Sequence, residues 1–191
     1  MKEWTIEDTM RLATYKYVTD CDNVRIKETI KRKLLNNDDI IHVLDNKKLQ
    51  SAEAENDEYF GVNILPYYMI TPTQTESKNF ICFTVGYRDV SKYNDLVKLL
   101  HITFVILCEQ KNIKDRDTGI ARHDLLAALI QNEFNYTNFF GRKLQLIQDE
   151  ESVVDTNYAC RTLTFVQITD NNVTKTHNDK ITRIANKEIH T

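Results

Sequence analysis

The stretch that decides the fold is residues 97–108, VKLLHITFVILC. Its even-numbered positions from Leu100 to Cys108 are all apolar, and most of its odd-numbered positions are apolar too. Because successive side chains of a strand point to opposite faces, this pattern predicts a central strand that is covered on both faces. Residues 79–87 place apolar side chains on one face, and the polar connection 88–96 joins the two segments, which predicts an antiparallel pair.

Downstream of this pair, the chain predicts one helix and two further strands. A wide apolar stripe predicts the helix over about residues 120–134, after a charged loop at 109–119. Residues 143–148 predict a short strand, 149–157 an acidic turn, and 158–168 the last strand. Arg161 is the only charged residue of that last strand, and we expect its partner to be Glu150, Glu151 or a neighbouring subunit.

Upstream of the pair, the sequence predicts three helical segments and a polar connection. Thr5 and Asp8 have the spacing of a capping box, and Ile6 and Met10 fall on one face of the helix that follows. That short amphipathic helix packs either on its own domain or on a neighbouring subunit. Residues 22–35 predict a second helix, Asn37 or Asp38 can cap a third, and residues 45–59 predict a loop.

The order of elements predicts an α+β fold, with a mostly antiparallel sheet of about four strands flanked by helices and with extended N- and C-terminal arms. We divide the chain into an N-terminal arm or helix at 1–21, an α+β domain at 22–169 and a polar C-terminal tail at 170–191. In that tail, only four apolar residues suggest a weak helix: Ile181, Ile184, Ala185 and Ile189. The tail is either free or an arm that orders on assembly. In the core, Phe104, Leu129 and Phe165 should pack against one another.

Composition excludes several classes of protein. The 191 residues are 41% hydrophobic and 28% charged, with a formal net charge of −3, as in an ordinary globular domain. No apolar stretch approaches the roughly 20 residues of a membrane span, and we expect no secretory signal. A near-neutral charge argues against a dedicated nucleic-acid binder, and the sequence contains no glycine-rich phosphate loop. The four cysteines are spread singly, which predicts buried free thiols in a reducing cytoplasm.

Few residues suggest catalytic chemistry. Asp115, Asp117, His123 and Asp124 are close enough in sequence to hold a divalent cation, but in loops such residues more often cap helices. A calcium loop that begins at Asp115 would need a glutamate at its twelfth position, where Leu126 stands. Cys108 or Cys160 could pair with His101, but both cysteines fall in predicted core strands. We therefore expect neither an enzyme nor a bound metal or cofactor, and we expect Arg122 and His123 to face solvent or a partner.

The second half of the chain resembles the neck proteins of tailed bacteriophages, and most of all the tail-terminator (tail-completion) family. The resemblance rests on the strand LHITFVILCEQ at 100–110, the helix that contains Arg122, His123 and Asp124, the segment GRKLQLIQDEE at 141–151 and the strand RTLTF at 161–165. It covers about residues 22–169 and is strongest over 97–168. Members of that family are small α+β subunits that form a ring, usually of six, between the capsid connector and the tail tube.

The resemblance implies a virion protein, found in the host cytoplasm before assembly, whose partners are copies of itself, the tail-tube protein and a connector or head-completion protein. Double-stranded DNA would pass through the ring without specific binding. A closed ring needs loops and arms that reach its neighbours. The candidate interface residues are Asp115, Arg116, Asp117, Arg122, His123, Glu150, Glu151, Arg161, Ile181, Ile184 and Ile189. Three alternatives are a head-completion or adaptor protein of the same neck, a metal-dependent DNA-processing enzyme and a monomeric adaptor for a host protein.

Overall fold

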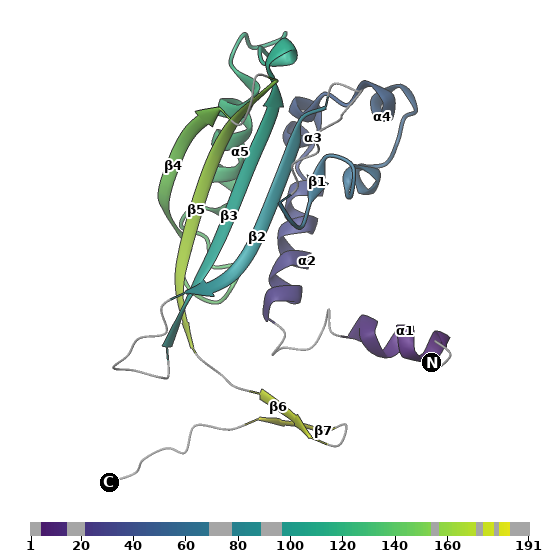
Figure 1. Ribbon diagram of the computed structural model, residues 1–191, viewed down its shortest axis with the longest axis vertical. Helices are drawn as coiled ribbons and strands as arrows, with labels where there is room; N and C mark the ends of the chain where they lie inside the picture. The colour runs from purple at the N-terminus through teal and green to yellow at the C-terminus, as the bar shows by residue number, and fades with distance from the viewer. Residues whose placement is uncertain are drawn as a thin grey trace.

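A computed structural model describes residues 5–14, 22–68, 78–88, 97–153, 157–170, 174–177 and 180–183 (Figure 1). Its helices are α1 (Ile6–Ala13), α2 (Asp22–Leu35), α3 (Asp38–Leu44), α4 (Lys47–Ser51) and α5 (Arg122–Phe134), with short 3-10 turns at Asn56–Tyr59 and Gln110–Asn112. Its strands are β1 (Ile64–Leu65), β2 (Phe80–Arg88), β3 (Val97–Glu109), β4 (Gln145–Val153), β5 (Tyr158–Asp170), β6 (Thr174–His177) and β7 (Lys180–Arg183).

The main sheet has five strands in the order β1-β2-β3-β5-β4. Strands β2 to β5 pair antiparallel, as expected, and the two-residue β1 adds a parallel partner to β2. The sequence prediction of an α+β fold is therefore confirmed, with one short strand more than expected. Strands β6 and β7 form a separate two-stranded sheet.

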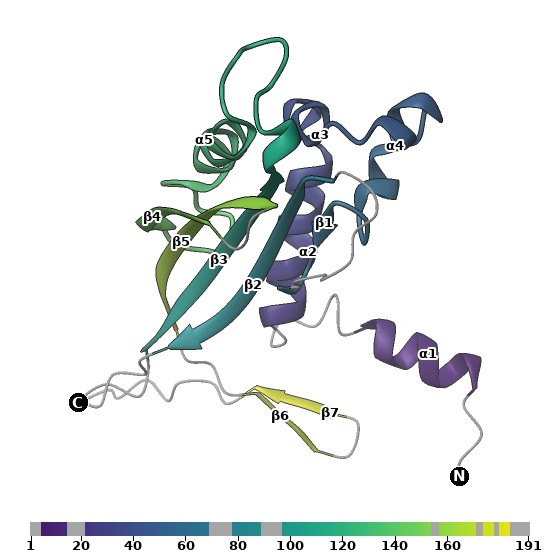
Figure 2. The same cartoon turned by 45° about the horizontal axis from the view of Figure 1, so that its top comes forward.

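One face of the sheet carries the core. Helices α2, α3 and α5 pack on this face (Figures 1 and 2), and the face presents the even-numbered residues of β3 from Leu100 to Cys108, all fully buried. Phe104 lies at the centre, with its ring centroid 5.8 Å from that of Phe165 and 5.1 Å from that of Phe134. The predicted strand-to-strand contact is correct, but the helix supplies Phe134 rather than Leu129, which is only partly buried. Leu126, Ile130 and Phe134 are the buried stripe, because residues four apart share a helix face.

The helices upstream follow their sequence signals. The side chain of Thr5 accepts a hydrogen bond from the backbone N–H of Asp8, and the Asp8 carboxylate accepts one from Thr5, so the capping box of α1 is complete. Asn37 caps α3 by accepting from the N–H of Ile40. Segment 45–59 is not the loop that we expected, because Asn46 caps a further short helix, α4, by accepting from the N–H of Leu49.

Two more expectations about secondary structure are wrong. Residues 149–153 are not part of a turn but continue β4, where they pair with residues 159–163 of β5. A cross-strand ion pair between Asp149 and Arg161 offsets the low strand propensity of this acidic stretch. In the C-terminal tail, residues 180–183 form β7 rather than a weak helix, because they pair with β6 in a hairpin.

Candidate functional site

Two arginines, Arg122 and Arg161, are each the centre of a network of hydrogen bonds and ion pairs. Arg161 is the more exposed of the two, and its network joins α5 to β4 and β5. Arg161, in β5, donates to both carboxylate oxygens of Asp149 in β4, with its Nε 2.7 Å from Oδ1 and its Nη2 3.1 Å from Oδ2. Its Nη1 donates to Asp124 in the first turn of α5. The two carboxylates raise the pKa of the Arg161 guanidinium further above its usual range. The hydrogen bonds from Arg161 in turn lower the pKa of Asp149, although partial burial opposes them.

His123 extends the same set of contacts. Its side chain is only 5% exposed, and Nε2 lies 3.1 Å from Oε1 of Glu151 and 3.4 Å from Oδ1 of Asp124. From α5, Gln131 also donates to Asp149, at 2.7 Å. Six residues form this set of contacts between α5 and strands β4 and β5, and we call them the seam cluster: His123, Asp124, Gln131, Asp149, Glu151 and Arg161.

The second arginine, Arg122, is buried at the other side of α5. It donates to the carbonyl oxygens of Val43 and Asn112, and it forms ion pairs at 3.2 Å with both Asp45 and Asp115. Hydrogen bonds from Thr118 to Asp115 are the main cause of the lowered pKa of that carboxylate, which burial opposes and Arg122 reinforces. This network ties α3 and the 109–119 loop to α5, so it stabilises the fold.

These positions correct the expectation that Arg122 and His123 face solvent or a partner. Both residues are less than 5% exposed. The sequence RHD at the start of a helix looks like a solvated first turn, but α3 packs beside α5 and supplies acceptors that sequence spacing does not reveal. The sequence also missed Asp124 and Asp149 as partners of the strand arginine, and Gln131 as a further donor to Asp149. The only sequence signal for these contacts was that a charged arginine in a strand needs a carboxylate partner. That signal led us to expect Glu150 or Glu151 instead of Asp149.

Of the four candidate metal residues, only His123 and Asp124 contact each other, at 3.4 Å. Asp115 pairs with Arg122, Asp117 lies 3.1 Å from His42, Asp124 binds Arg161, and His123 faces Glu151. Among the residues that the structure describes, no group of three His, Cys, Asp or Glu side chains is arranged to hold a metal ion. Cys108 and His101 also fail to meet, because they lie on opposite faces of β3, and burial raises the pKa of the Cys108 thiol well above its usual range.

A comparison with protein families shows where this chain belongs. The model of the YomW family matches residues 37–166, which is more than half of the chain. The chain belongs to the YomW family. This match supports a phage-related protein. No curated protein matches the chain.

The range matched by the YomW family contains both arginine networks and the sheet from β1 to most of β5. Helices α1 and α2 and the β6–β7 hairpin lie outside it. The family match therefore covers the part of the molecule that holds the arginine networks, and the terminal elements lie outside the matched range.

The other candidate interface residues differ in how freely they are presented. Arg116, Asp117 and Glu150 are exposed, Glu151 is exposed but held by His123, and Asp115 is buried. Ile181 lies in β7, and Ile184 and Ile189 lie outside the described residues. Of the described cysteines, Cys82, Cys108 and Cys160 are buried free thiols, as expected, and Cys21 lies outside the described residues.

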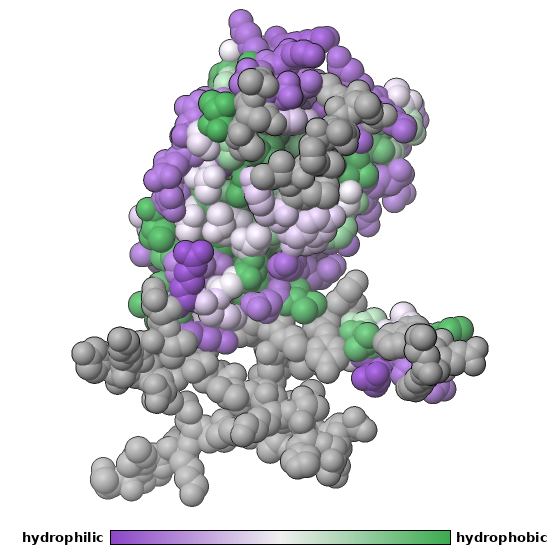
Figure 3. All heavy atoms as spheres, viewed as in Figure 1, coloured by the Kyte–Doolittle hydropathy of each residue, from purple (hydrophilic) through white to green (hydrophobic). Residues whose placement is uncertain are grey.

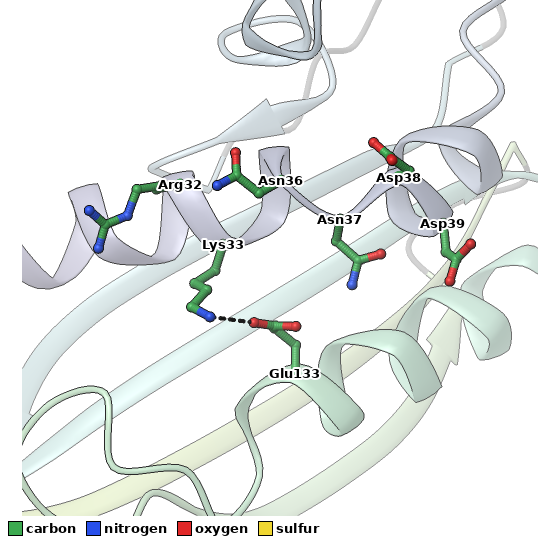
Figure 4. Close-up of a pocket in the computed structure, with 7 residues that line it drawn as sticks. All are labelled: Arg32, Lys33, Asn36, Asn37, Asp38, Asp39 and Glu133. Atoms are coloured by element: carbon green, nitrogen blue, oxygen red, sulfur yellow. Dashed lines mark ion pairs between the residues drawn. The ribbon is translucent and has the colours of Figure 1, made fainter.

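One surface depression lies between α2, α3 and α5 (Figure 4). Its lining is polar: Arg32, Lys33, Asn36, Asn37, Asp38, Asp39 and Glu133. Lys33 and Glu133 close its floor with an ion pair at 3.1 Å, and Asn37 is used as the cap of α3. Its basic side chains, Arg32 and Lys33, lie at one end and its acidic side chains Asp38 and Asp39 at the other, so it offers no field of one sign to a charged ligand.

Exposed apolar side chains are concentrated at the periphery. Ile6 and Met10 of α1 are 75% and 65% exposed, and Figure 3 shows hydrophobic residues on the outside of this helix. Ile147 and Val153 are similarly exposed on β4. Among the helices that the structure describes, none is long and apolar enough to cross a membrane.

Proposed function

We propose that this protein is a structural, non-enzymatic virion component of a tailed phage, and that its copies join head to tail into a ring at the junction of head and tail. In this proposal the ring has six subunits, ends the tail tube and docks it to the connector, as in the tail-terminator family. A place as a head-completion or adaptor protein in the same neck is the second candidate. The YomW family match supports the phage-related part of the proposal.

The single observation that carries the assembly role is the exposed apolar face of α1. The helix has eight residues and a complete capping box, yet Ile6 and Met10 are mostly exposed. Isolated helices shorter than about 12 residues are marginal in water, so a surface that covers these side chains is needed to stabilise α1. In an assembly, a neighbouring subunit supplies that surface.

The position of α1 suits a head-to-tail contact. In Figures 1 and 2, α1 projects on the side of the molecule opposite to β4. A ring with heterologous contacts needs two different surfaces on opposite sides of each subunit, since each copy gives one surface and receives on the other. Helix α1 on one side and the exposed side chains of β4, which include Ile147 and Val153, on the other are such a pair of surfaces.

Native mass spectrometry and analytical ultracentrifugation of the purified full chain test this proposal. We expect a concentration-dependent oligomer that the double variant Ile6→Ser, Met10→Ser dissociates, because the exposed apolar contact is lost. The matched control Glu7→Ser changes an exposed polar residue of the same helix and should assemble normally. A chain that stays monomeric at all concentrations, and also in the presence of tail-tube protein, would contradict the ring and favour the monomeric adaptor. Mass spectrometry of purified virions tests its location.

The metal-dependent enzyme alternative has its own test. Because only His123 and Asp124 of the four candidate residues contact each other, and Arg161 already binds Asp124, we expect Mg²⁺, Mn²⁺ and Ca²⁺ to leave the melting temperature unchanged. A real site would add about 2.7 kcal/mol of stability at a hundredfold excess over its dissociation constant. A stabilisation of that size that Asp117→Ala removes would overturn the non-enzymatic proposal.

A further inference from the structure

We propose that the β6–β7 hairpin of one copy adds to the outer edge of β4 in a neighbouring copy, so that the five-stranded sheet continues into the next subunit. This inference rests on the proposed function, since it names one contact of the ring. It concerns residues 174–183 and 148–153, and the second region lies inside the range matched by the YomW family whereas the first does not.

The receiving surface is an open strand edge. Among the residues that the structure describes, β4 is the last strand of the sheet and pairs on one side only, with β5. Every β4 residue except Leu146 is exposed. The register with β5 is interrupted between Leu146 and Gln148 and then runs without a break from Gln148 to Val153. An open edge of this kind presents unpaired backbone N–H and C=O groups to an incoming strand.

The inserted element is a hairpin that lacks a third strand. Strands β6 and β7 have four residues each and form their own sheet, apart from the main one (Figures 1 and 2). A two-stranded hairpin is at best marginally stable alone in water, and a third strand or a packed face is needed to stabilise it. Four residues also fit within the six continuous positions of β4.

Charge selects this hairpin as the occupant of the edge. β4 carries three consecutive acidic residues, Asp149 to Glu151, whereas the hairpin sequence TKTHNDKITR has three basic residues and one acidic residue. Two acidic β4 edges would repel each other, so direct β4–β4 pairing is disfavoured, and a basic strand is attracted. Asp149 and Glu151 are already held by Arg161 and His123, which leaves the exposed Glu150 as the acidic residue available to the hairpin.

The length of the connection from β5 to β6 favours a hairpin from another copy at the acidic part of the edge. Asp149 pairs with Leu163, seven residues before the end of β5 at Asp170, which is about 23 Å along the strand. The four steps of chain from Asp170 to Thr174 span at most about 14 Å. Strand β6 therefore cannot begin beside the acidic residues of its own β4. The same limit does not apply to a neighbour, whose hairpin approaches from outside.

Hydrogen exchange of the full chain at low and high protein concentration tests the contact. We expect the amides of 148–153 and of 174–183 to exchange more slowly at high concentration, and both to lose this protection on dilution. Protection of β4 that does not depend on concentration would overturn the inference, because it would mean that the chain covers its own edge. Normal association without protection of β4 would overturn it too, while leaving the ring intact.

A charge exchange identifies the pair of elements. Glu150→Lys and Lys180→Glu should each weaken association by about tenfold, and the double variant with the two charges exchanged should restore it. The control Glu58→Lys changes an exposed acidic residue outside the sheet and should have no effect. Association that both single variants leave unchanged would contradict the inference. A wild-type chain that never associates would instead remove the proposed function itself.

Discussion

The centre of the sheet and its β4 edge differ in how completely the rest of the chain covers them. At the centre, Phe104 and Phe165 are fully buried and pack edge to face, and the core around them is closed by helices of the same chain. At the edge, β4 is exposed along almost its whole length. The comparison teaches that the described part of the chain covers its own core but leaves an edge strand and an amphipathic helix exposed. Stability and assembly should therefore respond to different substitutions.

The largest expected effect is at the centre. Phe104→Ala should lower the free energy of unfolding by about 3–5 kcal/mol, because it removes a buried ring and leaves a cavity between Phe134 and Phe165. Urea denaturation measures the change. Phe139→Ala is the matched control, since Phe139 touches the same aromatic group but is 39% exposed, and it should cost clearly less. A loss below about 1 kcal/mol for Phe104→Ala would show that the sheet is not centred on this residue.

The second effect compares the two arginines. Arg122→Ala should lower the free energy of unfolding by about 3 kcal/mol, because it leaves the Asp115 carboxylate buried without its cation. Arg161→Ala should cost only about 1 kcal/mol, because its side chain is 25% exposed and water can replace it. Denaturant unfolding of both variants checks the order. Equal losses of unfolding free energy would mean that the seam cluster excludes water as completely as the Arg122 network does.

The same contrast explains what the sequence could predict. The alternation of apolar residues over β2 and β3 is a local signal, because the residue pattern itself shows whether one face or both faces of a strand are buried. The predicted strands and their pairing are confirmed. The capping residues Thr5 and Asn37 act over three residues, so they too were predictable.

Features that depend on long-range partners were not predictable. Residues 149–153 are acidic and resemble a turn, and only the pairing with β5 and the ion pair with Arg161 make them a strand. In the sequence, Arg122 resembles a solvated helix residue. In the structure, α3 and its C-terminal cap place the Val43 carbonyl and Asp45 beside it. Which residue of α5 meets Phe104 depends on the rotation of the helix, so the sequence named Leu129 where the fold uses Phe134.

A third, smaller effect should appear in the pH dependence of stability. The pKa of Asp149 is lower in the folded chain than its ordinary value of 3.8, since Arg161 donates to it. The unfolded chain therefore binds more protons in this range, and the contribution of Asp149 is present above about pH 4 and is lost as the pH falls through the folded pKa. Asp149→Asn should flatten the acid limb of a plot of unfolding free energy against pH. Asp115 keeps its lowered pKa in that variant, so part of the slope should remain. An unchanged acid limb would contradict this role of the contact.

The smallest expected effect is at α1, and it separates the two regions most clearly. Ile6 and Met10 are mostly exposed, so the variants Ile6→Ser and Met10→Ser remove little apolar surface that folding of the single subunit buries. Each should therefore change the free energy of unfolding of a dilute, monomeric sample by less than about 0.5 kcal/mol. The same substitutions should abolish association if a neighbouring subunit covers the helix. Urea denaturation below the association range, followed by ultracentrifugation above it, measures both quantities on one preparation. A loss of more than about 1 kcal/mol in the dilute sample would mean that α1 packs on its own domain, and the contrast between a self-sufficient centre and a dependent periphery would then hold for β4 alone.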